Sequence, residues 1–375
     1  MNKNIYKSFD DLPESSRELF ADAIAATGIF ASLPWFQNFA SAVPEIAQHL
    51  LIYSVESDLS SGKSTLLLPM RHEAPGKGLF APRHLNAAAN FYSALFTPIT
   101  STATASTRTE LNALATAIAA ERPRWDTVDL HPMPIDSPLF DNTVDAFRLA
   151  GMAVQRYFCF GNWYLEVGGR SYQQYFENLP STLKNTLKRK SRHLDNSDDM
   201  RIKIISSVDD VAEAIAAFET VYRSSWKTPE PYPDFIPGLI RTCAQEGWLR
   251  MGVAYVGDKP AAAQIWIVCS GVASIYKLAY DEQFAKLSVG SLLTSRLMQH
   301  VIDIDRVREV DYLMGDEPYK QDWMSHRRER WGIVAFNLRT AHGIFAATRN
   351  LGGQVVKKLM RRSMKAVPPN LRSPG

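Results

Sequence analysis

The chain has little cysteine and no long apolar run. Its 375 residues include 3 cysteines, Cys159, Cys243 and Cys269, at wide spacings in apolar surroundings. An odd number in this pattern excludes a disulfide framework and predicts buried thiols in a reducing compartment. The uncharged stretch 84–107 is rich in Ser, Thr and Asn, and the stretch 260–276 breaks at Ser270-Gly271, so neither predicts a transmembrane helix. The amino terminus shows no cleavable export signal, and we expect a cytoplasmic protein.

Three common site motifs are also missing. Gly62-Lys63-Ser64 ends like a phosphate-binding loop, but Ser57 stands where that loop needs its first glycine. The 8 histidines never fall at metal-ligand spacing and no cysteine pair accompanies them, so we expect no metal. A Gly-x-Ser-x-Gly elbow does not occur, which leaves a serine hydrolase without support.

Acidic residues are missing from the C-terminal end, where none follows Glu329. The formal net charge is +3, and the tail carries the bases Arg349, Lys357, Lys358, Arg361, Arg362, Lys365 and Arg372. Removing these seven positive charges from +3 leaves −4 for the rest of the chain. Because duplex binding usually needs a basic face on the folded domain itself, we expect no nucleic-acid partner.

The basic tail also has an apolar side. Before Pro368-Pro369, the bases alternate with Val355, Val356, Leu359, Met360 and Met364. One hypothesis is a helix that binds an anionic membrane surface from the cytoplasmic side. The other is a helix that packs its apolar stripe on the N-terminal half and leaves the charges in water.

Length and composition predict the general organisation. A chain of this length with 46% apolar and 22% charged residues predicts two globular domains. In the first half we expect helices at 14–27, 35–42 and 109–120, and strands at 50–54, 65–71 and 125–130. The prolines of 131–134 are expected to end regular structure, with a domain boundary near 150–165.

The second half alternates more clearly. We expect strands at 201–205, 249–256, 261–269, 273–280 and 309–313, with helices between them, one of them at 209–226. Tight turns between antiparallel strands, such as Gly257-Asp258-Lys259-Pro260, indicate an α+β fold rather than a doubly wound sheet.

Three segments of the second half combine residues typical of chemistry. The stretch 172–192 predicts a helix pair with one basic face, which is more often a solvated surface than a site. In 286–293, small residues at a strand-to-helix junction leave backbone N–H groups free for an anion, although such residues also cap helices. In 311–323, a strand ends in a cluster of acids, a phenol and an amine.

The order of these segments resembles a known family. The carrying residues are Ser225-Trp226-Lys227, Ala263-Gln264, Tyr276-Lys277, Tyr280-Asp281, Ser288-Val289-Gly290-Ser291, Asp311 and Gly315-Asp316-Glu317-Pro318-Tyr319-Lys320. Together they resemble the BioF2-like or CelD-like acetyltransferase group of the GNAT superfamily, which is similar in plan to the Fem-type peptidyltransferases. The resemblance covers about residues 165–325. Before residue 150, only Trp35-Phe36, Leu68-Pro69 and Asn90-Phe91-Tyr92-Ser93 match.

The resemblance implies an α+β fold of two tandem GNAT-like acyl-CoA N-acyltransferase domains, with mixed, mostly antiparallel sheets flanked by helices. It divides the chain into a degenerate GNAT-like domain (1–155), a BioF2-like acetyltransferase domain (156–340) and the basic tail (341–375). The implied activity is N- or O-acyl transfer from acyl-CoA, such as acetyl-CoA, to a small-molecule or sugar-linked acceptor in cell-envelope or extracellular polysaccharide synthesis.

The resemblance also implies site residues. The backbone of Ser288, Val289, Gly290, Ser291 and Leu292 would hold the donor's pyrophosphate at a helix N-terminus. Asp316 or Glu317 would serve as base and Tyr319 as acid. The expected substrate-binding residues are Trp226, Lys277, Tyr280, Asp311, Lys320 and Trp323.

Other interpretations of these residues stay open. Asp311 and Asp316 fit equally well in ion pairs with Lys277 or Lys320, or as helix caps. Trp226 and Trp323 fit a hydrophobic core. For the whole chain, one alternative takes an aminoacyl-tRNA as donor at the basic face of 184–192, although the charge of −4 disfavours it. Another is a non-catalytic scaffold for a polysaccharide-making membrane assembly.

Overall fold

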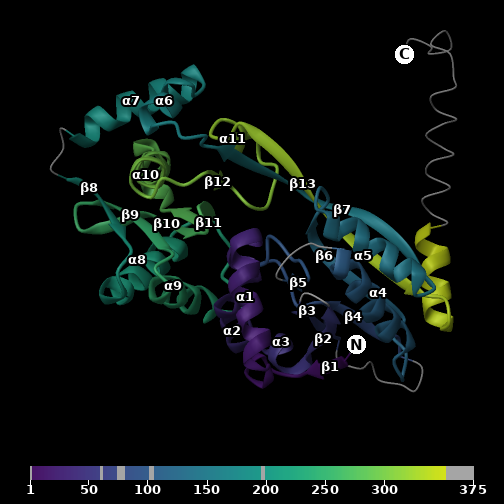
Figure 1. Ribbon diagram of the computed structural model, residues 1–375. Coiled ribbons are helices and arrows are strands. Elements are labelled where there is room, and N and C mark those ends of the chain that lie inside the picture. Colours follow the sequence, from purple (N-terminus) through teal and green to yellow (C-terminus); the bar gives the residue numbers. More distant parts are fainter. Residues whose placement is uncertain (1, 60–61, 74–80, 101–104, 196–198, 352–375) are drawn as a thin grey trace, which may run out of the picture.

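The computed structural model describes residues 2–59, 62–73, 81–100, 105–195 and 199–351 (Figure 1). Within these residues, a single 13-stranded sheet forms. Its strands are β1 (Asn2–Tyr6), β2 (Leu50–Leu59), β3 (Gly62–His72), β4 (His84–Ala87), β5 (Ile99–Thr100), β6 (Thr127–Pro134), β7 (Met152–Glu166), β8 (Met200–Ile205), β9 (Leu249–Val256), β10 (Lys259–Cys269), β11 (Val272–Tyr280), β12 (Glu309–Asp311) and β13 (His326–Asn337). The expected mixed, mostly antiparallel sheet flanked by helices is confirmed.

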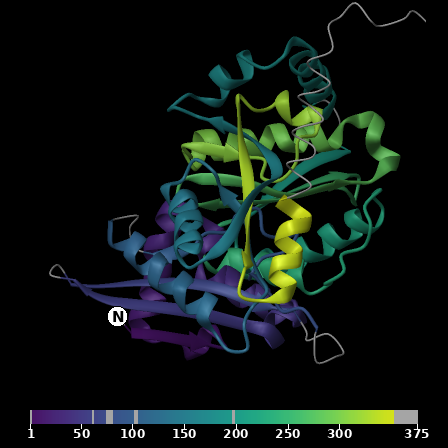
Figure 2. The ribbon, with the colours of Figure 1, turned by 90° about the vertical axis from the view of Figure 1, so that its right-hand side faces the viewer.

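Two long strands join the halves of the sheet. The strand order is β1-β2-β3-β4-β6-β13-β7-β12-β11-β10-β9-β8, and β5 pairs with β3 off this path. β13 and β7 are antiparallel partners from His326↔Tyr164 to Asn337↔Met152. Figure 2 shows β13 running from the blue N-terminal half to the green C-terminal half. The C-terminal strand therefore completes the N-terminal half by pairing with β6.

Helices cover both faces of the sheet. They are α1 (Glu14–Thr27), α2 (Leu33–Ala42), α3 (Pro44–His49), α4 (Ala105–Ala120), α5 (Pro138–Leu149), α6 (Tyr172–Glu177), α7 (Ser181–Asp195), α8 (Val211–Arg223), α9 (Phe235–Gln245), α10 (Val289–Gln299) and α11 (Pro318–Gln321). Figure 1 shows α10 on one side of β9–β11 and α8 and α9 on the other. Serine hydroxyls cap several of these helices: Ser32 Oγ accepts from Trp35 N, and Ser171 forms a capping box with Gln174.

The central hydrophobic core belongs to both halves. It combines side chains of α1 and α2 with side chains of α8 and α9. Trp35 meets Phe235 edge-on at 5.6 Å between ring centroids, and Tyr92 stacks on Phe235 at 3.9 Å. Two further cores lie under α4 and α5 in the N-terminal half and under α10 in the C-terminal half. The halves are therefore joined by apolar packing as well as by β7 and β13.

Most of the elements expected from the sequence are present, but Pro132 does not end the strand expected at 125–130. β6 continues to Pro134. The pairing of β6 with β13 shifts register between Trp331 and Ile333, opposite His131 and Pro132. A proline at such a bulge removes no ladder hydrogen bond, because its missing N–H has no partner there. The expected boundary at 155/156 lies inside β7, and the division into domains stays a prediction.

The predictions on the cysteines and on the C-terminal tail have different outcomes. Cys243 and Cys269 are buried free thiols, whereas Cys159 is only partly buried. A helix at 341–351 follows β13, and its Phe345 is 66% exposed. The tail hypotheses concern residues 352–375, which lie outside the described residues. Within the described part of the chain, no helix has both the length and the apolar character needed to cross a bilayer.

Candidate active site

The site begins where two parallel strands separate. β11 and β12 pair at Val272↔Glu309, Ala273↔Val310 and Ser274↔Asp311, and the pairing stops there. Beyond this point β11 continues along β10 to Tyr280. The segment that follows β12 turns away at Leu313, whose φ of 56° is left-handed. The gap that opens between them is a cavity of about 380 Å³. We refer to it as the split cavity.

Residues from four segments line the split cavity. They are Phe91, Tyr92, Ala94, Trp226, Lys227, Ile275, Tyr276, Lys277, Leu278, Tyr312, Leu313, Met314, Glu317, Tyr319 and Lys320. The structure thus brings together five of the predicted site residues, Trp226, Lys277, Glu317, Tyr319 and Lys320. The first segment belongs to the N-terminal half, so both halves build the cavity.

A carboxylate and an ammonium group are paired at one wall. Lys277 Nζ lies 2.5 Å from Glu230 Oε1, and both side chains are largely buried. Tyr92 and Tyr222 each donate a hydroxyl hydrogen bond to Glu230, at 2.7 and 2.6 Å. Burial acts to raise the pKa of Glu230, but the hydrogen bonds from Lys277 and the two tyrosines outweigh it and leave the pKa lowered. Glu230 is therefore a carboxylate that holds Lys277 in place.

Lys227 is the second amine of the cavity. Burial, followed by the positive charge of Lys277, lowers the pKa of Lys227 to about 8. Part of the Lys227 population is therefore uncharged at neutral to mildly alkaline pH. Such a group can accept a proton or act as a nucleophile, which an ordinary lysine cannot do at that pH.

Glu317, Tyr319 and Lys320 follow the separated strand. Lys320 is 4% exposed, and its ammonium group lies 2.8 Å from Glu317 Oε2 and also donates to the carbonyl of Met314. Burial acts to raise the pKa of Glu317, but the hydrogen bond from Lys320 outweighs it and leaves the pKa lowered. Burial, followed by the charge of Glu317, raises the pKa of Tyr319 to about 12. The pair therefore offers an ionised carboxylate and a protonated phenol.

Asp316 points elsewhere. Its carboxylate is held at 2.9 and 2.8 Å by Nε and a terminal nitrogen of Arg327 on β13. The hydrogen bond from Arg327 lowers the pKa of Asp316. Asp316 is not among the residues that line the split cavity. The structure thus separates the two carboxylates that the sequence left as equivalent candidates.

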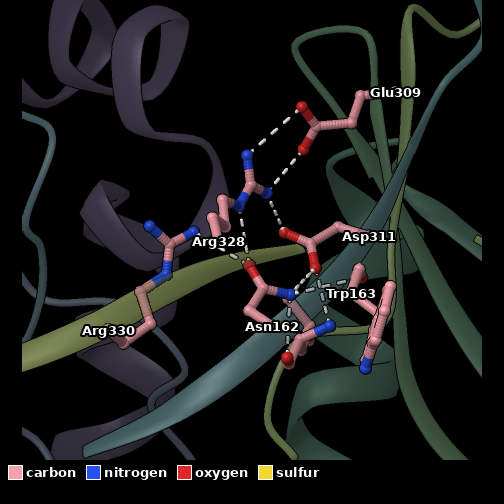
Figure 3. A network of polar contacts seen from close by, with 7 residues as sticks. Asn162, Trp163, Glu309, Asp311, Arg328 and Arg330 are labelled. Carbon is pink, nitrogen blue, oxygen red and sulfur yellow. Dashed lines mark hydrogen bonds and ion pairs between the residues drawn. The ribbon is translucent and has the colours of Figure 1, made fainter. Parts of the chain in front are cut away.

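Asp311 lies in a polar network behind the cavity (Figure 3). It is 5% exposed and accepts hydrogen bonds from Asn162 Nδ2 at 2.5 Å and from Leu313 N at 2.6 Å. It also pairs with Arg328. Asp311 and Asp316 do form ion pairs, but with Arg328 and Arg327 of β13, so the expected pairing with Lys277 or Lys320 is wrong. Asp311 thereby fixes the turn at Leu313.

The two tryptophans also differ. Trp323 is 6% exposed in the core under α10, as its core interpretation expected. Trp226 is 50% exposed at the cavity, and its ring lies 4.7 Å from that of Tyr280. A Cβ added at Gly290 would lie 3.5 Å from Tyr280 Cδ1. One aromatic ring therefore separates the split cavity from the first turn of α10.

The predicted donor loop forms the N-terminus of α10. Ser288 is left-handed with φ 57°, and its side chain makes no capping hydrogen bond. Val289 and Leu292 are buried, whereas Gly290 and Ser291 are only partly buried. The first amides of a helix have no acceptor inside it and carry partial positive charge. Lys190 Nζ donates to the carbonyl of Lys286 at 2.6 Å, which brings a cation of α7 to this loop.

Sequence reasoning did not identify Tyr92, Tyr222, Lys227 or Glu230 as site residues. Tyr92 and Glu230 lie 138 positions apart and meet only through the packing of the two halves. Lys227 stands next to the predicted Trp226, but its lowered pKa follows from burial, which neighbouring residues in the sequence do not reveal. Among the described residues, no group of three or more His, Cys, Asp or Glu side chains is arranged to hold a metal ion.

Comparisons with known proteins bear on the fold. Residues 181–321 match the model of the acetyltransferase (GNAT) domain. The crystal structure of FemX is similar with a TM-score of 0.58 and 6% identity, covering 90% of this chain and 98% of that chain. The C-terminal domain of a protein from Agrobacterium fabrum named as a lysylphosphatidylglycerol synthetase is similar with a TM-score of 0.51 and 12% identity, covering 89% and 95%. A search of curated protein sequences finds no match.

A third similar structure, a conserved protein of unknown function from Bacteroides thetaiotaomicron, has a TM-score of 0.53 and 9% identity, covering 87% of this chain and 98% of that chain. Identities this low show the fold alone. The chain thus shares the fold of FemX over nearly its whole described length, and residues 181–321 match a GNAT-type acetyltransferase domain. The narrower BioF2-like or CelD-like assignment stays a prediction.

Proposed function

We propose that the protein transfers an acyl group from acyl-CoA to an amine or hydroxyl acceptor in the split cavity. The observation that carries this proposal is the position of the cavity, between the separated ends of β11 and β12 and next to the first turn of α10. The backbone amides of Gly290 and Ser291 would bind the donor's pyrophosphate, and the acyl end would reach the cavity past Tyr280 and Trp226.

The cavity residues supply the proton transfers of this reaction. The acceptor's nitrogen or oxygen bonds to the acyl carbon while the carbon–sulfur bond breaks. Glu317, ionised and held by Lys320, takes the acceptor's proton, and Tyr319 gives a proton to the leaving thiolate. The proton on Glu317 then restores the phenol through water, so that both groups return to their starting state. Lys227, with its lowered pKa, is a second candidate base.

The test compares the two neighbouring carboxylates. Thiol release from acetyl-CoA is measured with a panel of amine and hydroxyl acceptors. We expect Glu317→Gln and Tyr319→Phe each to lower turnover at least tenfold with unchanged CoA affinity. Asp316→Asn is the matched control, because its carboxylate lies outside the cavity lining, and it should stay within about twofold of wild type. A tenfold loss in Asp316→Asn with normal Glu317→Gln would make Asp316 the base instead.

A second donor has one observation in its favour. Lys188, Arg189 and Arg192 are exposed on α7, which contacts the donor loop through Lys190. A basic surface there suits the phosphates of an aminoacyl-tRNA. Binding of CoA and of aminoacyl-tRNA measured at rising salt separates the donors, because only tRNA binding should weaken steeply. An acceptor in polysaccharide synthesis remains implied by the resemblance alone, and failure of both donors to bind would favour the scaffold alternative.

A further inference from the structure

A second cavity lies between the two halves of the chain. It has a volume of about 460 Å³. Its lining combines residues drawn from 26–30, 94–97 and 134–139 of the N-terminal half with residues of the C-terminal half that include Asp311, Leu313, Arg328 and Arg330. Ala94 and Leu313 line both this cavity and the split cavity. The two cavities are therefore neighbours that share a wall.

Arg330 is the unusual residue of the second cavity. It is 6% exposed, and among the described residues it forms no ion pair with a carboxylate. Its hydrogen bond to Asn162 Oδ1, at 3.1 Å, uses one of the five N–H donors of a guanidinium. Arg328, two positions earlier, already binds Glu309 at 2.6 Å and Asp311. Figure 3 shows Arg330 to one side of these acids.

A buried cation that no carboxylate contacts directly is unfavourable. Burial, followed by the charge of Arg328, lowers the pKa of Arg330 to about 10, yet at neutral pH the side chain stays charged. The spare donors of Arg330 match a planar or tetrahedral oxyanion, which guanidinium binds with two parallel hydrogen bonds. Arg308, Arg328 and Arg330 are balanced in the lining by Asp136, Glu309 and Asp311, so a ligand with one anionic group fits better than a polyphosphate.

We propose that Arg330 binds an oxyanion, a carboxylate or a phosphate ester, and that this group belongs to the acceptor substrate. The assignment to the acceptor rests on the proposed function, whereas the oxyanion site does not. Asn162 links the site to the split cavity, because its Oδ1 accepts from Arg330 and its Nδ2 donates to Leu313 O at 2.8 Å. An acceptor anchored at Arg330 can thus extend past Leu313 toward Glu317.

Anion-dependent thermal stability tests the site. Melting is measured in sodium phosphate, sodium acetate and sodium chloride at equal ionic strength. At tenfold excess over its dissociation constant, the preferred anion should raise the melting temperature of the wild type by about 2 °C over chloride. A larger shift with acetate identifies a carboxylate ligand. A larger shift with phosphate identifies a phosphate ester.

Variants assign the shift to Arg330. Arg330→Gln should abolish the shift, while Arg308→Gln, an exposed arginine of the same lining, should keep it. In chloride, Arg330→Gln should be at least as stable as the wild type, because it removes a buried charge that forms no direct ion pair. A full shift in Arg330→Gln, no shift in the wild type, or a strongly destabilised Arg330→Gln would each overturn the oxyanion site.

Kinetics tests the acceptor assignment separately. Arg330→Gln should raise KM for an acceptor that carries a carboxylate or phosphate at least tenfold, with unchanged affinity for CoA. If KM is unchanged while the anion-dependent shift in melting temperature still requires Arg330, the acceptor assignment is refuted and the oxyanion site is not. If CoA fails to bind while that shift persists, the proposed function is wrong and the oxyanion site remains.

Discussion

The two halves contain the same strand arrangement with different outcomes. In the N-terminal half, β4 and β6 pair in parallel at three positions that end with Asn86↔Asp129, just as β11 and β12 end with Ser274↔Asp311. After Asn86 the N-terminal chain fills its own gap: Phe96 N donates to Pro132 O at 2.6 Å, and Ala88, Ala89 and Phe96 are buried. The C-terminal gap stays open as the split cavity.

The segment that closes one gap also forms a wall of the other. Phe91, Tyr92 and Ala94 belong to the N-terminal half but line the split cavity. Tyr92 donates to Glu230, and its own carbonyl accepts from the Tyr276 hydroxyl at 3.1 Å. The N-terminal half therefore supports the site of the C-terminal half.

The largest effect should follow from removing the arginine that fixes the C-terminal split. Arg328→Ala leaves Asp311 and Glu309 without their cation, so we expect a loss of about 3–5 kcal/mol in the free energy of unfolding. Urea denaturation measures it. Arg327→Ala, whose pair with Asp316 is 34% and 43% exposed, should cost less than about 1 kcal/mol. Equal losses of unfolding free energy in the two variants would show that the ion pairs of Arg328 do not stabilise the separation of β11 and β12.

The number of CoA molecules bound per chain tests whether only one half of the protein binds the donor. We expect calorimetry to find one CoA per chain. Gly290→Asp should weaken CoA binding at least a hundredfold, which corresponds to about 2.7 kcal/mol, because a carboxylate would lie where the pyrophosphate binds. Gly290→Ala adds only a Cβ at ordinary contact distance from Tyr280 and should keep binding within a few-fold. A second CoA that survives Gly290→Asp would place a donor site in the N-terminal half.

Two tyrosine variants test whether the N-terminal half stabilises the site of the C-terminal half. Tyr92→Phe and Tyr53→Phe each remove a hydroxyl hydrogen bond of 2.7 Å to a glutamate, Glu230 and Glu121 respectively. Each should cost about 1.5–3 kcal/mol in the free energy of unfolding. Only Tyr92→Phe should also lower transfer activity, because it loosens the partner of Lys277. Equal activities of the two variants would remove the catalytic importance of the N-terminal wall.

The smallest effect concerns Lys227 and pH. The pKa of Lys227 is about 8 in the folded chain and about 10.4 in an unfolded one. Between these values the unfolded chain binds more protons, so this group makes stability rise with pH. Lys227→Met should therefore be more stable than wild type at pH 7, on the order of 1 kcal/mol, and this advantage should shrink by pH 10. An advantage independent of pH would contradict the lowered pKa.

Local patterns predicted many of the elements. The apolar spacing of 14–27 matches α1, and the predicted strand 249–256 matches β9. The prolines of β6 were misleading because the bulge at His131 and Pro132 forms only when β6 pairs with β13, some 200 positions later in the chain. The expected boundary fell inside β7 for a similar reason, since the pairing of β7 with β13 depends on a distant segment.

The sequence by itself determined individual elements such as α1 and β9, the basic face of α7 and the cluster after β12, because these depend on neighbouring residues. Only the tertiary structure decided which of Asp316 and Glu317 faces the split cavity, because that depends on where β13 places Arg327. It also brought Tyr92 to Glu230 and buried Arg330 beside Asn162. Burial and distant partners set the pKa of a group, and both arise only when the two halves pack together.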